Sequence, residues 1–325
     1  MAAMRALMLK ALSVLQLVRL PLALAVGSDL WLASLLARWN ADAADRPVAT
    51  LDLWLTLLLA GLVGGGMLGF AAGMNDLLDQ RRDQATNPGR PLPAGRMRTS
   101  HATLITFGSL VTALLAAALF GDDSLRVALL AAAGLVAWNL IGRHLPALGI
   151  PMMGLAHAGA MFIPWPGQPF TMPAALLLAQ ATLTGTLAHR RLGKRPPLDT
   201  QGSLLLAMLS LACVAGLLWL QWRRGADPWP PADRPWLALL PLLALGWFGW
   251  LLRAAAQAPA REDAALLLHR ALVASPPATA AAWCASLDHP VAAAAFAGTA
   301  VACWVLASLA REVHAMLAAP PAWRG

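Results

Sequence analysis

A group of acidic residues follows a purely apolar, glycine-rich stretch in the first quarter of the chain. Asn75, Asp76, Asp79 and Asp83 all fall within nine residues. If a helix continues through them, Asn75, Asp79 and Asp83 lie at four-residue intervals and share roughly one face with Asp76. Three acids on one face repel each other unless a cation holds them. Carboxylates are ligands that Mg²⁺ prefers, and Mg²⁺ usually keeps waters and binds substrate phosphates as well. The pattern therefore predicts a magnesium diphosphate site.

The loop after the acids holds an arginine between prolines. Pro91 and Pro93 cannot continue a regular helix, so Arg90 lies on a constrained loop beside the acids. A fixed guanidinium there could bind phosphate oxygens. Charge spacing alone leaves a second interpretation open, in which the acids form a solvated helix end that is balanced by Arg81, Arg82 and Arg90.

The elements that position these residues must be membrane helices. The 325 residues are 59% apolar and only 12% charged, whereas soluble globular domains are about 25% charged. Apolar runs of roughly 20 residues, long enough to cross a bilayer core as helix, recur along the whole chain. Glycines in the second run, such as Gly64 and Gly66, either let helices approach closely or leave room for a ligand. The composition predicts an all-α polytopic membrane protein with a single transmembrane domain over residues 1–325.

Charge and proline clusters divide the chain into nine expected spans. They cover about 11–37, 50–74, 102–120, 124–141, 146–165, 171–188, 202–222, 236–256 and 291–311. Cap loops are expected at about 75–101, 142–146 and 189–201. Segment 260–275 predicts an interfacial amphipathic helix, and a tenth, poorly formed span in this region stays open.

The distribution of basic residues predicts the orientation. Nine spans put the two termini on opposite sides of the membrane. With the amino terminus inside, 15 of the 24 Lys and Arg residues lie inside and 8 lie outside, which agrees with the positive-inside rule. The sequence therefore predicts a multi-pass protein of the cell inner membrane with a cytoplasmic amino terminus. The net charge of +8 is explained by this placement, so nucleic acid is not an expected partner.

The acid pattern resembles the first signature of the UbiA superfamily of intramembrane prenyltransferases, N-D-x-x-D-x-x-x-D followed by R-P-x-P-x-G. The matching residues are Asn75, Asp76, Asp79, Asp83, Arg90, Pro91, Pro93 and Gly95. Arg19 in the first span and Arg143 before the fifth are similar to cations that the family carries at these places.

The resemblance implies a helical bundle around a central cavity that opens sideways to lipid. It implies transfer of an isoprenyl group from an isoprenyl diphosphate to an aromatic or other lipophilic acceptor, in contact with membrane lipid. By the same resemblance, Mg²⁺ would be held by Asp76, Asp79 and Asp83, and Asn75 would orient the first carboxylates. Arg19, Arg90 and Arg143 would bind the diphosphate.

The chain departs from the family where the second acidic motif should end the sixth span. Its only acid between 186 and 200 is Asp199, and the segment is basic instead. In one interpretation this cluster replaces the second metal and contacts the diphosphate directly. In the other it only sets topology, and the protein is a non-catalytic prenyl-lipid binding or transport protein that retains the fold. The combination of Arg19, Leu20 and Pro21 in the first span with the missing second acidic motif is similar to the divergent EboC-type branch. The basic cluster comprises His189, Arg190, Arg191 and Lys194.

Three more polar residues fall within apolar segments. His144 and His157 flank the start of the fifth span and predict either packing or a hydrogen bond to substrate rather than a metal site. Asp29 lies in the first span, where burial with a partner or contact with the interface explains it. We expect no catalytic role for Asp29.

Overall fold

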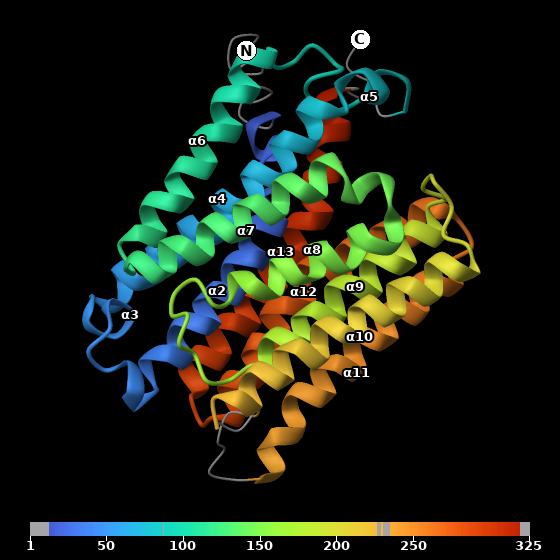
Figure 1. The fold of residues 1–325 in the computed structure, drawn as a ribbon. Helices are drawn as coiled ribbons and strands as arrows, with labels where there is room; N and C mark the ends of the chain where they lie inside the picture. The colour runs from blue at the N-terminus through green and yellow to red at the C-terminus, as the bar shows by residue number, and fades with distance from the viewer. Residues whose placement is uncertain (1–12, 87, 226–228, 230–234, 319–325) are drawn as a thin grey trace.

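The computed structural model describes residues 13–86, 88–225, 229 and 235–318, and within them it contains helices and no strand (Figure 1). Ten helices of 15 residues or more build the bundle in this part of the chain. They are α2 (Leu20–Arg38), α4 (Leu53–Leu78), α6 (Thr99–Ala118), α7 (Asp122–Leu140), α8 (Pro146–Ala160), α9 (Met172–Arg191), α10 (Thr200–Arg223), α11 (Leu239–Gln257), α12 (Arg261–Ser286) and α13 (Pro290–Ala318). The all-helical expectation is confirmed.

Nine of these ten helices coincide with the nine expected spans, but the count of nine crossings is not confirmed. Seven helices are long and apolar enough to cross a membrane, namely α2, α4, α6, α7, α10, α11 and α13. Helix α8 is short at 15 residues. Helices α9 and α12 carry more polar side chains because they lie inside the bundle rather than against lipid.

Helix α12 is where the structure departs from the sequence expectation. We expected an interfacial helix at 260–275 and left a tenth span open, and the structure has one helix of 26 residues, α12, which packs against α11, α13 and α2. Its second half is buried, with Pro276 and Trp283 inside. Charged residues in its first turns and two prolines at its centre lower its apolar character, so hydropathy alone does not identify it as a crossing.

This extra helix changes the expected topology. His289, just before α13, stacks on Trp39 at the end of α2, with ring centroids 3.6 Å apart. Further along α13, the Cys303 thiol lies 3.7 Å from the Pro21 carbonyl oxygen near the start of α2. Helix α13 therefore runs back toward the end of the bundle where α2 begins (Figure 1). Helix α2 therefore begins, and α13 ends, at the same end of the bundle, and the expectation of opposite sides, which depended on nine spans, is not confirmed.

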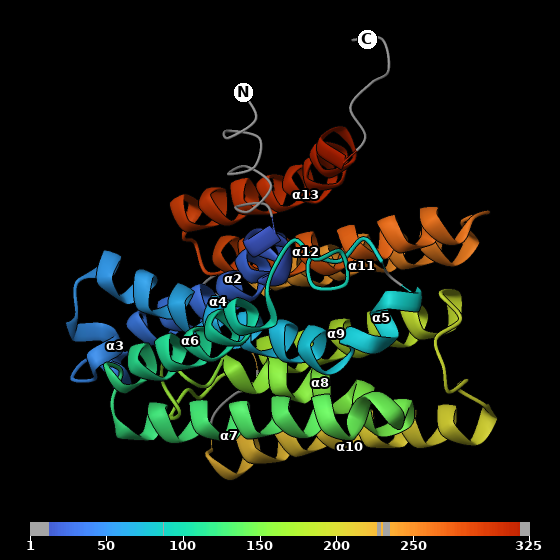
Figure 2. The ribbon, with the colours of Figure 1, turned by 90° about the horizontal axis from the view of Figure 1, so that it is seen from above.

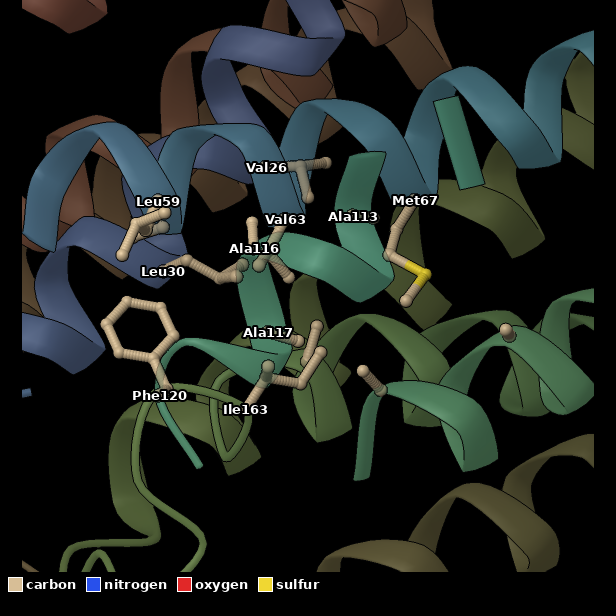
Figure 3. Packing of buried hydrophobic residues seen from close by; sticks show 14 of the residues in the cluster. Val26, Leu30, Leu59, Val63, Met67, Ala113, Ala116, Ala117, Phe120 and Ile163 are labelled. Carbon is tan, nitrogen blue, oxygen red and sulfur yellow. The ribbon is translucent and has the colours of Figure 1, made fainter. Parts of the chain in front are cut away.

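The bundle has a layered arrangement. Figure 2 shows α11, α12 and α13 on one side and α7 with α10 on the other. Between them α2, α4 and α6 share an apolar core (Figure 3). The outward faces are also apolar, since Leu204, Met208 and Leu211 of α10 are all more than half exposed, as expected for a surface in contact with lipid.

Glycines in α4 allow its neighbours to approach closely. A Cβ at Gly64 would lie 3.1 Å from the Gly27 Cα of α2, and one at Gly66 would lie 2.5 Å from the Ser109 carbonyl oxygen of α6. Of the two expectations for these glycines, close helix packing therefore explains Gly64 and Gly66. It also fixes the position of the acids at the end of α4.

Candidate functional site

The acids at the end of α4 point into the protein. Helix α4 ends at Leu78 with Asp79 as its C-cap, and the short helix α5 (Gln80–Thr86) continues the chain. The side chains of Asp76, Asp79 and Asp83 are 8%, 17% and 4% exposed. The alternative of a solvated helix end does not describe this arrangement, because the carboxylates are enclosed and paired.

Arg90 joins two of the acids. Its Nη1 lies 3.0 Å from Asp76 Oδ1 and donates a 2.6 Å hydrogen bond to Asp83 Oδ2. The loop that carries Arg90 is held in place by the buried side chain of Leu92 and by a turn at Gly95, whose φ of 67° suits glycine. The prolines keep this loop out of a helix, as expected, and the guanidinium therefore reaches back to α4.

Two further arginines reach the acids from other helices. Arg19 precedes α2 in a left-handed conformation, with φ 53° and ψ 56°, which places its Nη2 3.6 Å from Asp76 Oδ1. Arg143, in the short turn between α7 and α8, donates a 2.8 Å hydrogen bond to Asp79 Oδ1. A left-handed backbone costs a non-glycine residue roughly 1–2 kcal/mol. Such strain is often retained at functional sites.

Two supporting contacts complete this part of the site. Asn75 Nδ2 lies 3.5 Å from Asp76 Oδ1. From this position Asn75 could orient the Asp76 carboxylate, which is the role that the family resemblance implies. Arg143 Nε donates to His144 Nε2 at 3.1 Å. The sequence analysis did not predict this contact, although His144 directly follows Arg143 in the chain. We call the set Asp76, Asp79, Asp83, Arg90 and Arg143 the acid half of the site.

The last turn of α9 and the loop after it supply the second part of the site, which we call the basic half: His189, Arg190, Arg191 and Lys194. Three of its members contact other partners. His189 Nε2 lies 2.8 Å from the Pro196 carbonyl oxygen, Arg190 donates to Ser203 Oγ at 2.7 Å, and Arg191 donates to the Ala258 carbonyl oxygen. These contacts fix the loop and its neighbours, so the basic cluster does not gather around the acids as a unit.

Lys194 differs from the rest of the basic half. Partial burial, together with the nearby guanidiniums of Arg19, Arg90 and Arg82, holds the pKa of Lys194 below its ordinary value of 10.5. The Lys194 side chain is exposed. It lies within electrostatic range of Arg19 and Arg90, the arginines that contact Asp76. Among the described residues it has no carboxylate within ion-pair distance. An anion placed there would relieve this repulsion between cations.

Asp199, the only acid in this segment, has a structural role. Its side chain accepts a 2.7 Å hydrogen bond from the Gly202 backbone N–H and caps α10. Such a cap satisfies a free N–H at the helix start. Asp199 therefore does not take the place of the second acidic motif that is missing from this segment.

The acid half has the donor chemistry that Mg²⁺ prefers, but it is not a preformed cage. Within the described chain, no three acid, histidine or cysteine side chains are close enough together to hold a metal ion. Asp76 and Asp83 nevertheless converge on one cationic atom, Arg90 Nη1. A cation at that point would have two carboxylate ligands, with waters and phosphate to complete its shell. The residues thus fit a magnesium ion bound together with a phosphorylated ligand.

A separate polar pair lies deeper in the bundle. Asp29 of α2 and His157 of α8 are 3.0 Å apart between Oδ2 and Nε2, and both side chains are nearly buried. The sequence predicted a buried partner for Asp29 as one of its two explanations. It did not identify His157 as that partner, since the two residues are 128 positions apart in the chain. The pair is distinct from the site at the end of α4.

Two comparisons with known proteins find likenesses. The UbiA prenyltransferase family matches residues 30–195, about half of the chain. A solved structure described as a digeranylgeranylglyceryl phosphate synthase in membranes aligns with a TM-score of 0.55 and 16% identity. The alignment covers 86% of this chain and 98% of that one, and at this identity it supports the fold alone.

A search of curated proteins finds no match to the sequence. The EboC-type assignment is not confirmed and stays a prediction. The family match includes the acid half and the loop of Arg90, and the solved structure extends the likeness of fold to most of the chain. The chain belongs to the UbiA prenyltransferase family of membrane proteins.

Proposed function

We propose that this protein transfers an isoprenyl group from an isoprenyl diphosphate to an aromatic or other small lipophilic acceptor within the membrane. The observation that carries the proposal is the convergence of Arg19 and Arg90 on Asp76, with Lys194 within electrostatic range of both arginines. This arrangement joins carboxylates that suit a metal with cations that suit phosphate oxygens.

Asp76 and Asp83 would hold Mg²⁺ where their oxygens converge, and Asp79, the third expected ligand, would have to move toward them from its contact with Arg143. When bound, the metal would supply charge neutralisation to the departing diphosphate. Arg143 keeps Asp79 oriented, and Arg19 and Arg90 are placed to bind the diphosphate once it displaces them from the acids. In the transfer, the allylic C–O bond breaks, the diphosphate leaves with the bonding electrons, and the acceptor forms the new bond and releases a proton.

The basic half would contribute mainly through Lys194. Family members of the usual pattern hold a second metal on a second acidic pair, which this chain lacks. Lys194 provides one positive charge near Arg19 without a metal. Because His189, Arg190 and Arg191 are hydrogen-bonded elsewhere, their expected contact with diphosphate has less support than that of Lys194.

The cap end of the bundle, where Arg19, Asp76 and Arg143 lie, is placed in the cytoplasm in this proposal. The excess of Lys and Arg on this side supports that orientation. Helix α13 returns to the same end of the bundle. The inner membrane of the cell remains the expected location.

A second function stays open, because Asp199 is a helix cap and no second acidic pair is present between 186 and 200. In that case the protein retains the fold and binds or transports a prenyl lipid without turnover. It would then bind the diphosphate in a manner insensitive to a chelator.

The test uses the purified full chain in lipid nanodiscs with radiolabelled farnesyl or geranylgeranyl diphosphate, Mg²⁺ and a cellular lipid extract. We expect a labelled lipid product and diphosphate release, both lost in Asp79→Ala. The matched control is Asp123→Ala, an exposed acid paired with Arg126 at the far end of α7, which should retain activity. Binding without product or diphosphate release for either donor would favour the second function.

A further inference from the structure

A large groove lies between α2, α4 and α13. Helix α2 lines it with Trp31 and Trp39, α4 lines it with Leu57, and α13 lines it with Ala295 and Phe296. We call the hollow between these residues the side groove. Its volume is about 740 Å³, which is within the range of known ligand sites. The side groove is therefore large enough to hold a ligand.

The side groove is separate from the diphosphate site. Among the described residues that line it, none belongs to the acid half or the basic half. Trp39 ends α2, whereas Arg19 precedes it, and the length of the helix between them is about 30 Å at the helical rise per residue. The contacts proposed for the diphosphate therefore do not explain this groove.

Contacts between the helices hold the walls of the side groove in place. Trp31 Nε1 donates a 2.7 Å hydrogen bond to the Leu57 carbonyl oxygen and joins α2 to α4. The ring of His289, directly before α13, stacks on Trp39 and joins α13 to α2. A groove with fixed walls loses little conformational freedom when a ligand binds. The side groove is thus formed before a ligand arrives.

A second hollow, more polar than the first, adjoins the side groove. Trp39 and His289 line both hollows, and Asn40 and Phe170 also line the second, whose volume is about 330 Å³. The Asn40 side-chain oxygen accepts a hydrogen bond from the Asp42 N–H, which leaves the amide NH₂ group as a donor. An apolar groove beside a polar hollow matches an amphiphile, because its chain and its head group need different surroundings.

The charge of the lining favours a zwitterionic head group. Asp288 lines the side groove with an exposed side chain, and within the described ranges its carboxylate has no hydrogen bond or ion pair. No Lys or Arg is among the described residues that line either hollow. An ammonium suits Asp288, and the faces of nearby Trp rings also attract cations. A phosphate can accept from Asn40 and His289, but a head group with net negative charge meets no permanent cation there.

We propose that the side groove and the adjoining hollow bind one phospholipid with a zwitterionic ammonium head group, of the phosphatidylethanolamine class. Its acyl chain lies against Trp31 and Phe296, its phosphate lies at Asn40 and His289, and its ammonium lies at Asp288. The bilayer supplies this lipid, because the groove belongs to a membrane protein. The bound lipid fills the space between α4 and α13, and the proposal does not depend on prenyl transfer.

Photo-crosslinking of the full chain in lipid nanodiscs tests the proposal. The probes are phosphatidylethanolamine and phosphatidylglycerol with the same diazirine-labelled acyl chain, each added to nanodiscs of one fixed composition. We expect phosphatidylethanolamine to label the side groove more strongly, as read by mass spectrometry of the crosslinked peptides. Asp288→Asn should lower this preference about twofold to fivefold, the effect of one exposed ion pair. Asp123→Asn, an exposed acid on α7, is the control and should keep the preference. Equal labelling by both lipids in the unaltered protein would overturn the proposal.

A filling variant shows whether the label comes from the groove itself. Ala295 is exposed and lines the side groove, so Ala295→Phe should remove the labelling with little change in Tm. Ala294→Phe, at an exposed position outside the lining, should leave the labelling intact. Unchanged labelling in Ala295→Phe would place the lipid elsewhere and contradict the proposal. Farnesyl thiolodiphosphate should not compete with the lipid, and displacement by it would assign the groove to the prenyl donor instead.

Discussion

The two halves of the site handle charge in opposite ways. In the acid half, each carboxylate contacts a guanidinium, so that Asp76, Asp79 and Asp83 are matched by Arg90, Arg143 and the neighbouring Arg19. In the basic half, His189, Arg190 and Arg191 contact neutral oxygen atoms. The acid half is therefore close to neutral before any ligand binds, while the basic half leaves positive charge unmatched.

This difference suggests a division of labour. Neutralised carboxylates do not attract a diphosphate, but they can exchange their guanidiniums for a metal when the ligand arrives. An unmatched ammonium such as Lys194 attracts the anion from the start. If the division holds, damage to the acid half should affect folding and turnover, whereas damage to the basic half should affect ligand binding.

The largest effect is expected for Arg90→Ala. This change leaves Asp76 and Asp83 buried without their shared cation, and removing one member of a buried ion pair costs about 3–5 kcal/mol. The thermal unfolding midpoint of the detergent-solubilised protein should fall sharply and prenyl transfer should be lost. Arg126→Ala is the control, since Arg126 is 75% exposed and such pairs contribute about 0–1 kcal/mol. Equal stability of both variants would mean that Arg90 does not hold the acid half together.

A smaller loss of stability is expected for Gly66→Ala, which tests how the acid half is positioned. The new Cβ would lie 2.5 Å from the Ser109 carbonyl oxygen, and overpacking of this kind costs about 1–3 kcal/mol. The displaced α4 should also reduce turnover. Gly65→Ala is a closely matched control, because no atom lies within 4 Å of a Cβ there. If both variants unfold at the same temperature, close packing against α6 does not determine the position of the acids.

The sequence predicted the acid half better than the basic half, for a physical reason. Asp76, Asp79 and Asp83 are close in sequence, and the helical period places them on one side. Pro91 and Pro93 restrict the loop of Arg90 in the same local way. The pairing of Arg143 with Asp79 depends on the packing of distant helices, and the family resemblance suggested only that Arg143 would bind the diphosphate.

The basic half shows what sequence spacing cannot determine. His189, Arg190, Arg191 and Lys194 are neighbours in the chain, yet their side chains diverge at the end of α9. The partners of Arg190 and Arg191 are on α10 and beyond α11, and nothing local identifies them. The sequence left open whether α12 is a further span for a related reason, since a helix buried among other helices can carry polar residues that a lipid-facing helix excludes.

Lys194→Met separates the members of the basic half. Removal of this ammonium should weaken binding of farnesyl thiolodiphosphate, an unreactive analogue, about tenfold, or about 1.4 kcal/mol, as expected for one lost charge-assisted contact. Arg190→Met should change the affinity less than about twofold, because Arg190 donates to Ser203. Isothermal titration calorimetry measures both. An equal loss for the two variants would mean that the basic half acts through its total charge and not through Lys194.

The smallest effect is expected from pH, and it tests the same lysine without a change of fold. Partial burial and the surrounding guanidiniums hold the pKa of Lys194 below its ordinary 10.5. As pH rises, the Lys194 ammonium of the ligand-free protein therefore loses its proton at a lower pH than an exposed lysine does. A bound diphosphate restores the proton, and affinity for the analogue should therefore fall as pH increases toward 10.5. The ester phosphates are already ionised well below this range, since their second pKa is about 6. Lys194→Met should remove most of this fall, and an unchanged pH dependence in the variant would assign it to another cation.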